Sequence, residues 1–246
     1  MIRLMRKIRF RSIIQNRFSM YLIYAAGEIL LVVIGIIIAL MLDDWHDRRA
    51  LEFEKKQYLK ALFNDYRLDS LMLTDYIDRY TEIEHHLKEL NRRAYQPVAN
   101  FDTIISIAQK DYSPKSDFIS FYNTTTLKTI ESNGKIEIFD TNLRVEMLKH
   151  FQYQNLSIEN QKNDAGRINS KMDEYTNKYK IGRGSNTVGT YLDTISWKIE
   201  NEREFVVLFT EMIGINHLVA RLWINQYRSL LEETERMIAL LREAQH

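Results

Sequence analysis

Residues 21–42 read YLIYAAGEILLVVIGIIIALML, and Glu28 is the only charged residue among them. A helix of this length, about 33 Å, matches the hydrocarbon core of a bilayer, which is roughly 30 Å thick. Residues 29–42 have no polar side that would face water, so a buried helix of a soluble domain is the weaker interpretation. The stretch therefore predicts a transmembrane helix.

Aromatic residues flank this helix, and its exit carries no cleavage site. Tyr21 and Tyr24 lie at its start and Trp45 follows its end, as in the aromatic belts of membrane interfaces. The apolar run is longer than the roughly 7–15 residues of a signal peptide core. No small-x-small motif follows it, because residues 39–43 read ALMLD. We therefore expect an uncleaved signal anchor over residues 21–43.

The basic residues near the N-terminus predict the orientation. Residues 1–20 contain six Arg and Lys and no acidic residue. Residues 43–62 contain five, but they belong to a large domain, and large domains cross membranes largely regardless of their charge. We expect residues 1–20 to be a basic cytoplasmic tail and residues 44–246 to be an extracytoplasmic helical domain. In a bacterium this is a single-pass protein of the cell inner membrane with its bulk in the periplasm.

The composition of the 246 residues favours long helices. Apolar residues make up 45% of the chain and charged residues 27%, which is enough apolar material for a folded core. Two prolines and eight glycines are few, which argues against a sandwich or a barrel. The absence of cysteine excludes disulfides, thiolate metal ligands and cysteine nucleophiles. A net charge of +1 and the lack of basic, aromatic patches in the soluble part argue against nucleic-acid binding.

Apolar residues three and four positions apart predict a long helix over residues 46–93. One slot in its apolar stripe, at Asp69 and Ser70, is polar. Both prolines fall within residues 94–115, which we interpret as a connection with at most a short helix around residues 101–110. The stripe consists of Leu59, Leu62, Tyr66, Leu73, Ile77, Tyr80, Ile83, Leu87 and Leu90.

A second, modest helix is expected over residues 117–133, with Asn133 and Gly134 as its C-cap pair. Residues 135–139 read KIEIF, and this alternation suits a strand. Because no partner strand is predicted, we interpret them as an extended link. Residues 181–190 contain three of the eight glycines and predict a loop.

Two long helices complete the predicted domain. One covers residues 140–180, with the aspartate that opens it as the N-cap. Gln154 and Gln161 dilute its apolar stripe and Gly166 weakens it, so we expect a bend or local melting there. The last helix covers residues 201–244.

Helices of matched length joined by loops pack antiparallel. The sequence therefore predicts an all-α fold, in which the N-terminal transmembrane helix continues into an elongated antiparallel three- to four-helix bundle. A long parallel coiled coil is less favoured, because the stripe of the last helix moves to a new face near Trp223. Leu222 is expected in the bundle core.

No catalytic or cofactor-binding constellation emerges from the sequence. Residues 184–190 have the glycine spacing of a phosphate loop, but they lack the lysine after the second glycine and a preceding strand. Glu82 and His85 have the spacing of a di-metal ligand pair, yet the only repeat is Glu243 with His246. We predict a non-enzymatic protein without a cofactor, a metal site or an identifiable small-molecule ligand.

Glu28 is the costly residue of the membrane helix, since a charge near mid-membrane costs about 2.5–3.5 kcal/mol or more. Gly27, Leu31, Gly35 and Ala39 recur four residues apart beside it, and small residues at this spacing let another helix approach closely. Two interpretations stay open. Either Glu28 faces a partner helix and this face is an association surface, or Glu28 reaches the inner headgroups by snorkelling.

Residues 24–40 read YAAGEILLVVIGIIIAL, and Trp45 follows among polar residues. This order resembles an uncharacterised family of bacterial membrane proteins, a domain of unknown function found in Gram-negative envelopes. Its members have a basic N-terminus, a Tyr, Gly-Glu, Val-Val-Ile-Gly, Ala-Leu helix and an Asn-rich Trp motif; here Trp45 is surrounded by aspartates and a histidine instead. Residues 125–151 are similar to the family's central segment. The resemblance implies membrane attachment and a helical body, but no activity.

These observations give one main hypothesis and one alternative. The main hypothesis is a non-enzymatic, membrane-anchored helical scaffold or interaction protein of the bacterial envelope. It contacts the lipid bilayer and binds a partner protein or forms a homo-oligomer. The alternative is a sensory or accessory subunit whose helical domain binds a ligand or partner. Such a subunit would signal through another protein, because the predicted cytoplasmic tail is too short for an output domain.

Overall fold

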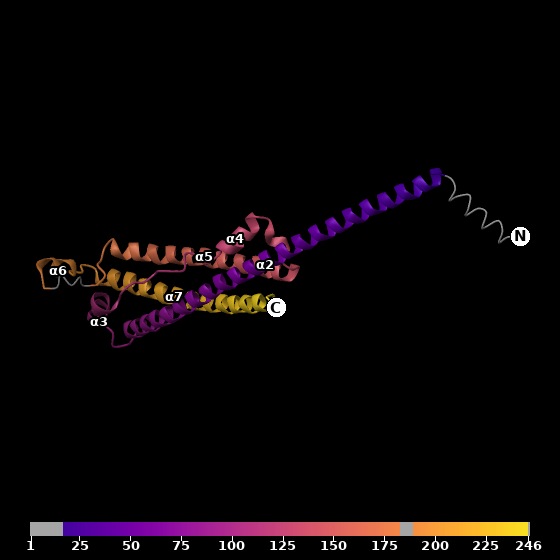
Figure 1. The fold of residues 1–246 in the computed structure, drawn as a ribbon. Coiled ribbons are helices and arrows are strands. Elements are labelled where there is room, and N and C mark those ends of the chain that lie inside the picture. The colour runs from indigo at the N-terminus through magenta and orange to yellow at the C-terminus, as the bar shows by residue number, and fades with distance from the viewer. Residues whose placement is uncertain (1–16, 183–188, 246) are drawn as a thin grey trace. The chain divides into compact units, whose positions relative to one another are not determined.

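The computed structural model describes residues 17–182 and 189–245. Among these residues helices are the only regular elements, so the prediction of an all-α fold is confirmed. The chain forms two compact units, Met1–Lys56 and Gln57–His246. One long helix, α2 (Arg17–Ala94), supplies the described part of the first unit and then the first long helix of the second (Figure 1). The predicted continuation of the apolar helix into the helical domain is therefore observed.

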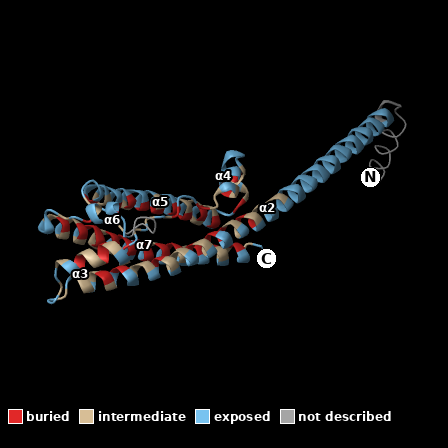
Figure 2. Ribbon diagram, turned by 90° about the vertical axis from the view of Figure 1, so that its left-hand side faces the viewer, coloured by how far each residue is buried: buried red, intermediate tan, exposed pale blue. Residues whose placement is uncertain are grey.

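The second unit is a bundle of three long helices. The part of α2 from Gln57 onward packs with α5 (Thr141–Thr176) and α7 (Glu202–Glu243). Figure 2 shows that their buried residues lie on the sides that face one another. This packing confirms the helical bundle, because each helix buries one apolar stripe and leaves its other sides in water.

The contacts between the helices fix their directions. Arg236 binds Glu146 at one end of the α5/α7 pair, and Lys171 binds Glu211 toward the other, so α5 and α7 are antiparallel. The Arg242 guanidinium lies 5.4 Å from the Phe63 ring centroid, while His217 lies 2.9 Å from a Glu84 carboxylate oxygen. Helix α7 is therefore antiparallel to α2 as well. It follows that α2 and α5 run in the same direction, whereas helices joined in sequence were expected to pack antiparallel.

Capping residues set the starts of the two later helices. Asp140 accepts a hydrogen bond from the Leu143 N–H at 3.0 Å, as predicted, and Asn201 accepts one from the Glu204 N–H at 3.0 Å. Helix α5 runs through Gly166 without interruption, so the expected local melting is wrong, while a bend there stays a prediction. It ends at Thr176, short of the predicted end. A six-residue helix, α6 (Tyr191–Ser196), precedes α7.

A crossover joins the end of α2 to the start of α5. It begins with α3 (Phe101–Ser106) and a single π-helical turn, η1 (Ile107–Asp111). These elements fall where a short helix was predicted. The crossover ends with α4 (Thr125–Ser132) and a 3₁₀ turn, η2 (Lys135–Ile138).

The middle of the crossover, residues 112–124, forms neither helix nor strand, and we call it the extended segment. It runs back along α2, because the Tyr80 hydroxyl donates to the Asp117 carbonyl at 2.5 Å and the Asn123 N–H donates to Asp69 at 2.9 Å. The six residue steps from Asp117 to Asn123 thus run beside the 11 steps of α2 from Tyr80 to Asp69, because an extended chain advances about 3.3 Å per residue and an α-helix only about 1.5 Å. The segment can be followed between α3 and α4 in Figure 1.

Two corrections to the predicted helices follow. The helix expected over residues 117–133 begins only at Thr125, because the residues before it belong to the extended segment. Its end is as predicted: Gly134 adopts φ +66°, the left-handed conformation that glycine tolerates best. Residues 135–138 form the 3₁₀ turn η2, so the link expected there is extended only at Phe139.

Trp223 of α7 is fully buried among aromatic rings of the bundle core. Its ring contacts Tyr80 of α2 at a centroid distance of 5.1 Å and Phe118 of the extended segment at 5.8 Å. Leu222, by contrast, is 43% exposed. The expectation that Leu222 lies in the core is therefore wrong, because the buried stripe of α7 passes through the next residue.

Trp223→Ala should lower the free energy of unfolding of the full-length chain by about 3–5 kcal/mol, because it opens a large cavity among aromatic rings. Leu222→Ala should change it by less than about 0.5 kcal/mol, because the side chain is half in water. Chemical unfolding in mild detergent, followed by circular dichroism, measures both. A larger loss for Leu222→Ala would contradict the observed register of α7.

Candidate functional site

The apolar part of α2 is exposed along its length. Every residue of 20–42 is exposed, and the most apolar window of the helix has a mean hydropathy of 2.7 with none of it buried. Helix α7 is also long and apolar enough to cross a membrane, but 44% of its window is buried within the bundle. Residues 20–42 are therefore a candidate membrane span, while the burial of α7 is that of a core helix.

The structure places the predicted association face on one side of this helix. Gly27, Leu31, Gly35 and Ala39 are all in α2, and each step of four residues turns by only about 40°. A Cβ atom added at Gly27 or Gly35 meets nothing within 4 Å. Glu28 is exposed beside them. The space for a second helix is present, and association through this face stays a prediction.

The predicted interface residues are also exposed. Tyr21 and Tyr24 lie at the start of the apolar stretch, and Trp45 lies just after its end. The Arg49 guanidinium lies 4.7 Å from the centroid of the Trp45 ring, within the range of a cation–π interaction. This end of the stretch thus joins an aromatic ring with a positive charge, a pair that suits the headgroup region.

The bundle interior holds a buried carboxylate, Asp69 of α2, with no exposed surface. One of its oxygens accepts from the Asn123 backbone N–H at 2.9 Å and from the Asn123 Nδ2 at 2.7 Å. The other accepts from the Gln154 Nε2 at 2.8 Å. Asp69 thereby joins α2 to the extended segment and to α5.

Burial controls the electrostatics of this carboxyl. Loss of water raises the pKa of Asp69 above its usual value, and the nearby charge of Asp65 raises it further. The three donors from Asn123 and Gln154 act in the opposite direction, because they stabilise the charged form. The adjacent Tyr66 is buried too, and burial raises the pKa of its hydroxyl. The hydrogen-bond donors to Asp69 are therefore all amides. This arrangement suits a residue that joins three segments of the fold.

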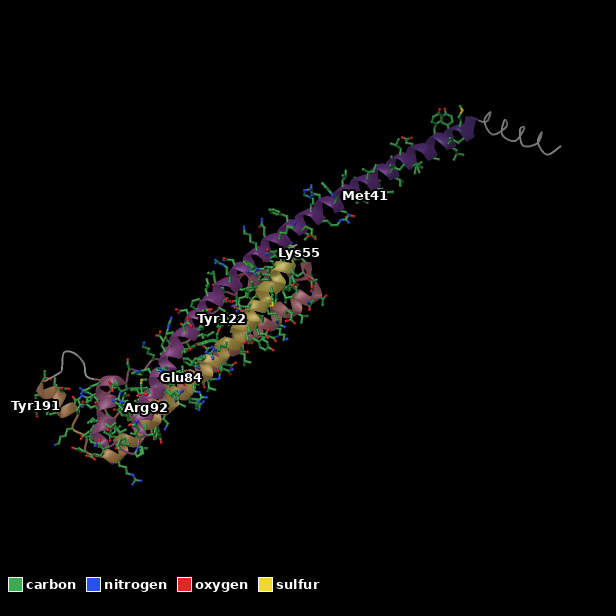
Figure 3. The ribbon with its side chains drawn as sticks, turned by 90° about the horizontal axis from the view of Figure 1, so that it is seen from below. Met41, Lys55, Glu84, Arg92, Tyr122 and Tyr191 are labelled. Carbon is green, nitrogen blue, oxygen red and sulfur yellow. The ribbon has the colours of Figure 1, made fainter. Side chains whose placement is uncertain are left out.

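A second set of buried polar groups continues from this junction. Gln161 donates to the Ser157 hydroxyl at 2.7 Å and accepts from the Tyr227 hydroxyl at 2.7 Å. Tyr122 of the extended segment lies 3.5 Å from the same serine oxygen, and burial raises the pKa of Tyr122 to about 12. Figure 3 shows Tyr122 between the helices. We call these residues the buried polar cluster: Asp69, Asn123, Gln154, Tyr122, Ser157, Gln161 and Tyr227.

His150 of α5 is a further buried titratable group. Thr234 donates its only hydroxyl proton to the Leu230 carbonyl at 2.7 Å, so at 2.9 Å it accepts from the His150 Nε2–H. The other ring nitrogen, Nδ1, has no hydrogen-bond partner among the described residues. The ring packs edge-on against Tyr66. Burial, and to a smaller extent the charge of Arg236, lowers the pKa of His150 to about 4.

Sequence reasoning missed this interior. The sequence analysis interpreted Asp69, Gln154 and Gln161 as polar interruptions of the apolar stripes. In the structure all three are buried and form hydrogen bonds. A signal was present: polar residues occupy stripe positions on two different helices. Such a pattern predicts hydrogen bonds between the two helices, because buried polar groups nearly always have a hydrogen-bond partner.

The described residues include the candidate metal pair Glu82 and His85 but only part of the candidate phosphate loop. Glu82 and His85 are exposed on α2. Among residues 17–182 and 189–245 no three His, Cys, Asp or Glu side chains are grouped as metal ligands. Most of the predicted phosphate-loop motif, residues 184–188, lies outside the described residues, and so does His246.

The comparisons with known proteins identify the family. A family model described as "Family of unknown function (DUF6090)" matches residues 28–213. The chain belongs to this family. The resemblance to a family of unknown function is thus confirmed, although the match does not test the membrane-helix motif itself. No curated protein and no solved structure matches the chain.

The DUF6090 match covers most of the features described above. It starts at Glu28 and ends at Ile213 in α7, so it contains the Asp69 junction with Asn123 and Gln154. The second half of α7, which supplies Trp223 and Tyr227 to the core, lies beyond it.

Replacing Asp69 tests the junction of this DUF6090 protein. Asp69→Leu leaves three buried donors without an acceptor and should lower the free energy of unfolding by about 3 kcal/mol or more at pH 7. Asp69→Asn should cost less, because its oxygen still accepts from Asn123 and a flipped Gln154 amide accepts from its nitrogen. Asp78→Leu, on the exposed side of the same helix, is the control. Equal stability of the Asp69→Leu and Asp78→Leu variants in chemical unfolding would refute the junction.

His150 predicts a specific pH dependence. Because its pKa is lowered in the folded state, its contribution to stability is complete above pH 6.5 and is lost as the pH falls from 6.5 toward 4. The loss amounts to about 3 kcal/mol at most. His150→Phe should remove this part of the pH dependence of unfolding, while His85→Phe, at an exposed position, should retain it. Identical pH profiles for the two variants would contradict the burial of His150.

Proposed function

We propose that this chain is a single-pass, membrane-anchored interaction protein of the bacterial envelope and that it performs no catalysis. The observation that carries the proposal is the composition of α2. Its residues 20–42 are apolar and exposed, and from Gln57 onward the same helix forms part of a bundle core. A helix of this kind suits an anchor that is built into the domain it holds.

The interior of the domain supports a binding role over an enzymatic one. Each polar group of the buried polar cluster is engaged with another protein group, and these bonds join segments of the fold. An active site needs reactive groups that face a substrate cavity. Among the groups with shifted pKa values, Tyr80, Tyr112 and Tyr227 are buried, and their hydroxyls form hydrogen bonds within the fold.

The orientation follows from the charges around the anchor. Residues 1–20 carry only basic charges, and short basic segments stay in the cytoplasm. In this proposal the bundle lies in the periplasm, where it binds its partner beside the inner membrane.

Labelling of single cysteines tests the anchor and its orientation, because the chain has no native cysteine. Ser170→Cys, at an exposed position of α5, should react with a membrane-impermeant maleimide in intact spheroplasts. Ser12→Cys should react only after the cells are permeabilised. The opposite pattern would reverse the orientation, and recovery of the chain in the soluble fraction would refute the anchor.

A further inference from the structure

A cavity of about 310 Å³ lies where α2, the extended segment and α7 meet. Helix α2 contributes one face from Arg79 to Leu87, in the stretch around the Glu84 label of Figure 3. The extended segment contributes residues 113–115, and α7 contributes Asn216. Small-molecule sites have volumes of roughly 300–1,000 Å³, so this cavity suits a small ligand.

Hydrogen bonds on both sides of residues 113–115 fix the extended segment beside the cavity. On one side, the His86 Nε2 donates to the Asp111 carbonyl at 2.9 Å, since a carbonyl only accepts. On the other side, Arg79 donates to the Asp117 carboxylate and Tyr80 donates to the Asp117 carbonyl, both at 2.5 Å. The wall that residues 113–115 form is therefore attached to α2 at both ends.

Asn216 provides an acceptor atom that no other described residue uses. The residue is only 3% exposed, and its Nδ2 donates to the Met212 carbonyl and to the Tyr112 hydroxyl, both at 2.9 Å. Because a carbonyl only accepts, these bonds assign the nitrogen and leave Oδ1 as the remaining polar atom. Within residues 17–182 and 189–245 Oδ1 has no hydrogen-bond partner, yet it is not sealed from solvent. Since Asn216 lines the cavity, Oδ1 is available to a donor placed there.

Two opposite charges line the cavity from different elements. Lys115 belongs to the extended segment and Glu82 to α2, and both are exposed. Neither forms an ion pair with any residue that the structure describes. Arg79 also lines the cavity, but its charge is balanced by Asp75 and Asp117. The cavity therefore offers one ammonium and one carboxylate group to a ligand.

The remaining contacts are mainly apolar. Ile83, Leu87 and Pro114 line the cavity, and we call them the apolar wall. Leu87 is only 5% exposed, and Ile83 packs against the bundle core, so this wall is part of the folded interior. A hydrocarbon group placed against it leaves water, which favours binding.

We propose that this cavity binds a free α-amino acid with an apolar side chain. The ammonium group of the ligand donates to the Asn216 Oδ1 and faces the Glu82 carboxylate. Its carboxylate accepts from Lys115 and from the Ser113 hydroxyl, and its side chain packs on the apolar wall. The sequence did not indicate such a ligand, because the lining comes from three segments far apart in the chain. Binding at this cavity needs neither the anchor nor its orientation, so it is independent of the proposed function.

Isothermal titration calorimetry of the full-length chain in detergent micelles tests the class of ligand. The probes are L-leucine, L-methionine and L-phenylalanine. Two analogues of leucine test the charges: 4-methylpentanoate lacks the ammonium group, and 3-methylbutylamine lacks the carboxylate. Each analogue should bind about tenfold more weakly than L-leucine or worse, because it loses charged hydrogen bonds. The proposal is overturned if none of the three amino acids binds, or if either analogue binds as tightly as L-leucine.

Substitutions in the extended segment test the place of binding. Ser113→Phe should abolish binding of L-leucine, because the ring occupies the cavity. Ser120→Phe, at an exposed position of the same segment outside the lining, is the matched control and should leave the affinity unchanged. Both variants should keep the helical circular dichroism and unfolding midpoint of the parent chain. Equal affinities of the two variants for L-leucine overturn the inference.

Two further variants test the polar contacts and do not depend on the folding of Ser113→Phe. Lys115→Ala should weaken binding of L-leucine about twofold to fivefold, whereas Lys162→Ala, at an exposed position of α5, should not change it. Asn216→Leu should weaken binding of L-leucine about tenfold or more and leave the affinity for 4-methylpentanoate unchanged, because only leucine has the ammonium donor. An equal loss for both compounds would show that Asn216 acts only through the fold and would overturn the assigned contact.

Discussion

The carboxylate of Asp69 is where three segments far apart in the sequence meet. Its oxygens accept hydrogen bonds from the extended segment and from α5, and its own backbone belongs to α2. A buried carboxylate without these donors is strongly unfavourable, so the site forms only when all three segments are in place. The junction therefore specifies one arrangement of the bundle more than it adds to stability.

The directions of the helices explain why the extended segment is needed. Helices α2 and α5 are parallel, so the chain has to travel the length of the bundle between them. An extended chain covers that distance in about half as many residues as a helix, because it advances about 3.3 Å per residue and a helix only about 1.5 Å. The extended segment passes through the interior, where Tyr112, Ile119 and Tyr122 are buried. Its backbone and side chains then become part of the polar and aromatic core.

The sequence predicted the elements that depend on local chemistry. The apolar helix, the caps at Asp140 and Gly134, and the last helix all follow from residue types and spacing. The extended segment was not predictable in this way. Its apolar residues also suit a short helix, and only long-range contacts decide between a helical and an extended conformation. The same holds for Gln154 and Leu222: their burial depends on which face meets the neighbouring helix, and periodicity leaves an uncertainty of one position.

The order of the helices has a consequence for synthesis. Helix α2 leaves the ribosome first, and its apolar stripe from Leu59 to Leu90 is completed by α7, which is made last. The stripe therefore waits while more than a hundred further residues are translated, roughly 5–20 s at about 5–20 residues per second. During that interval the apolar face of α2 has no partner helix and is exposed to water. A chaperone that covers this face, or a pause in translation before α7, would therefore change the yield of folded protein.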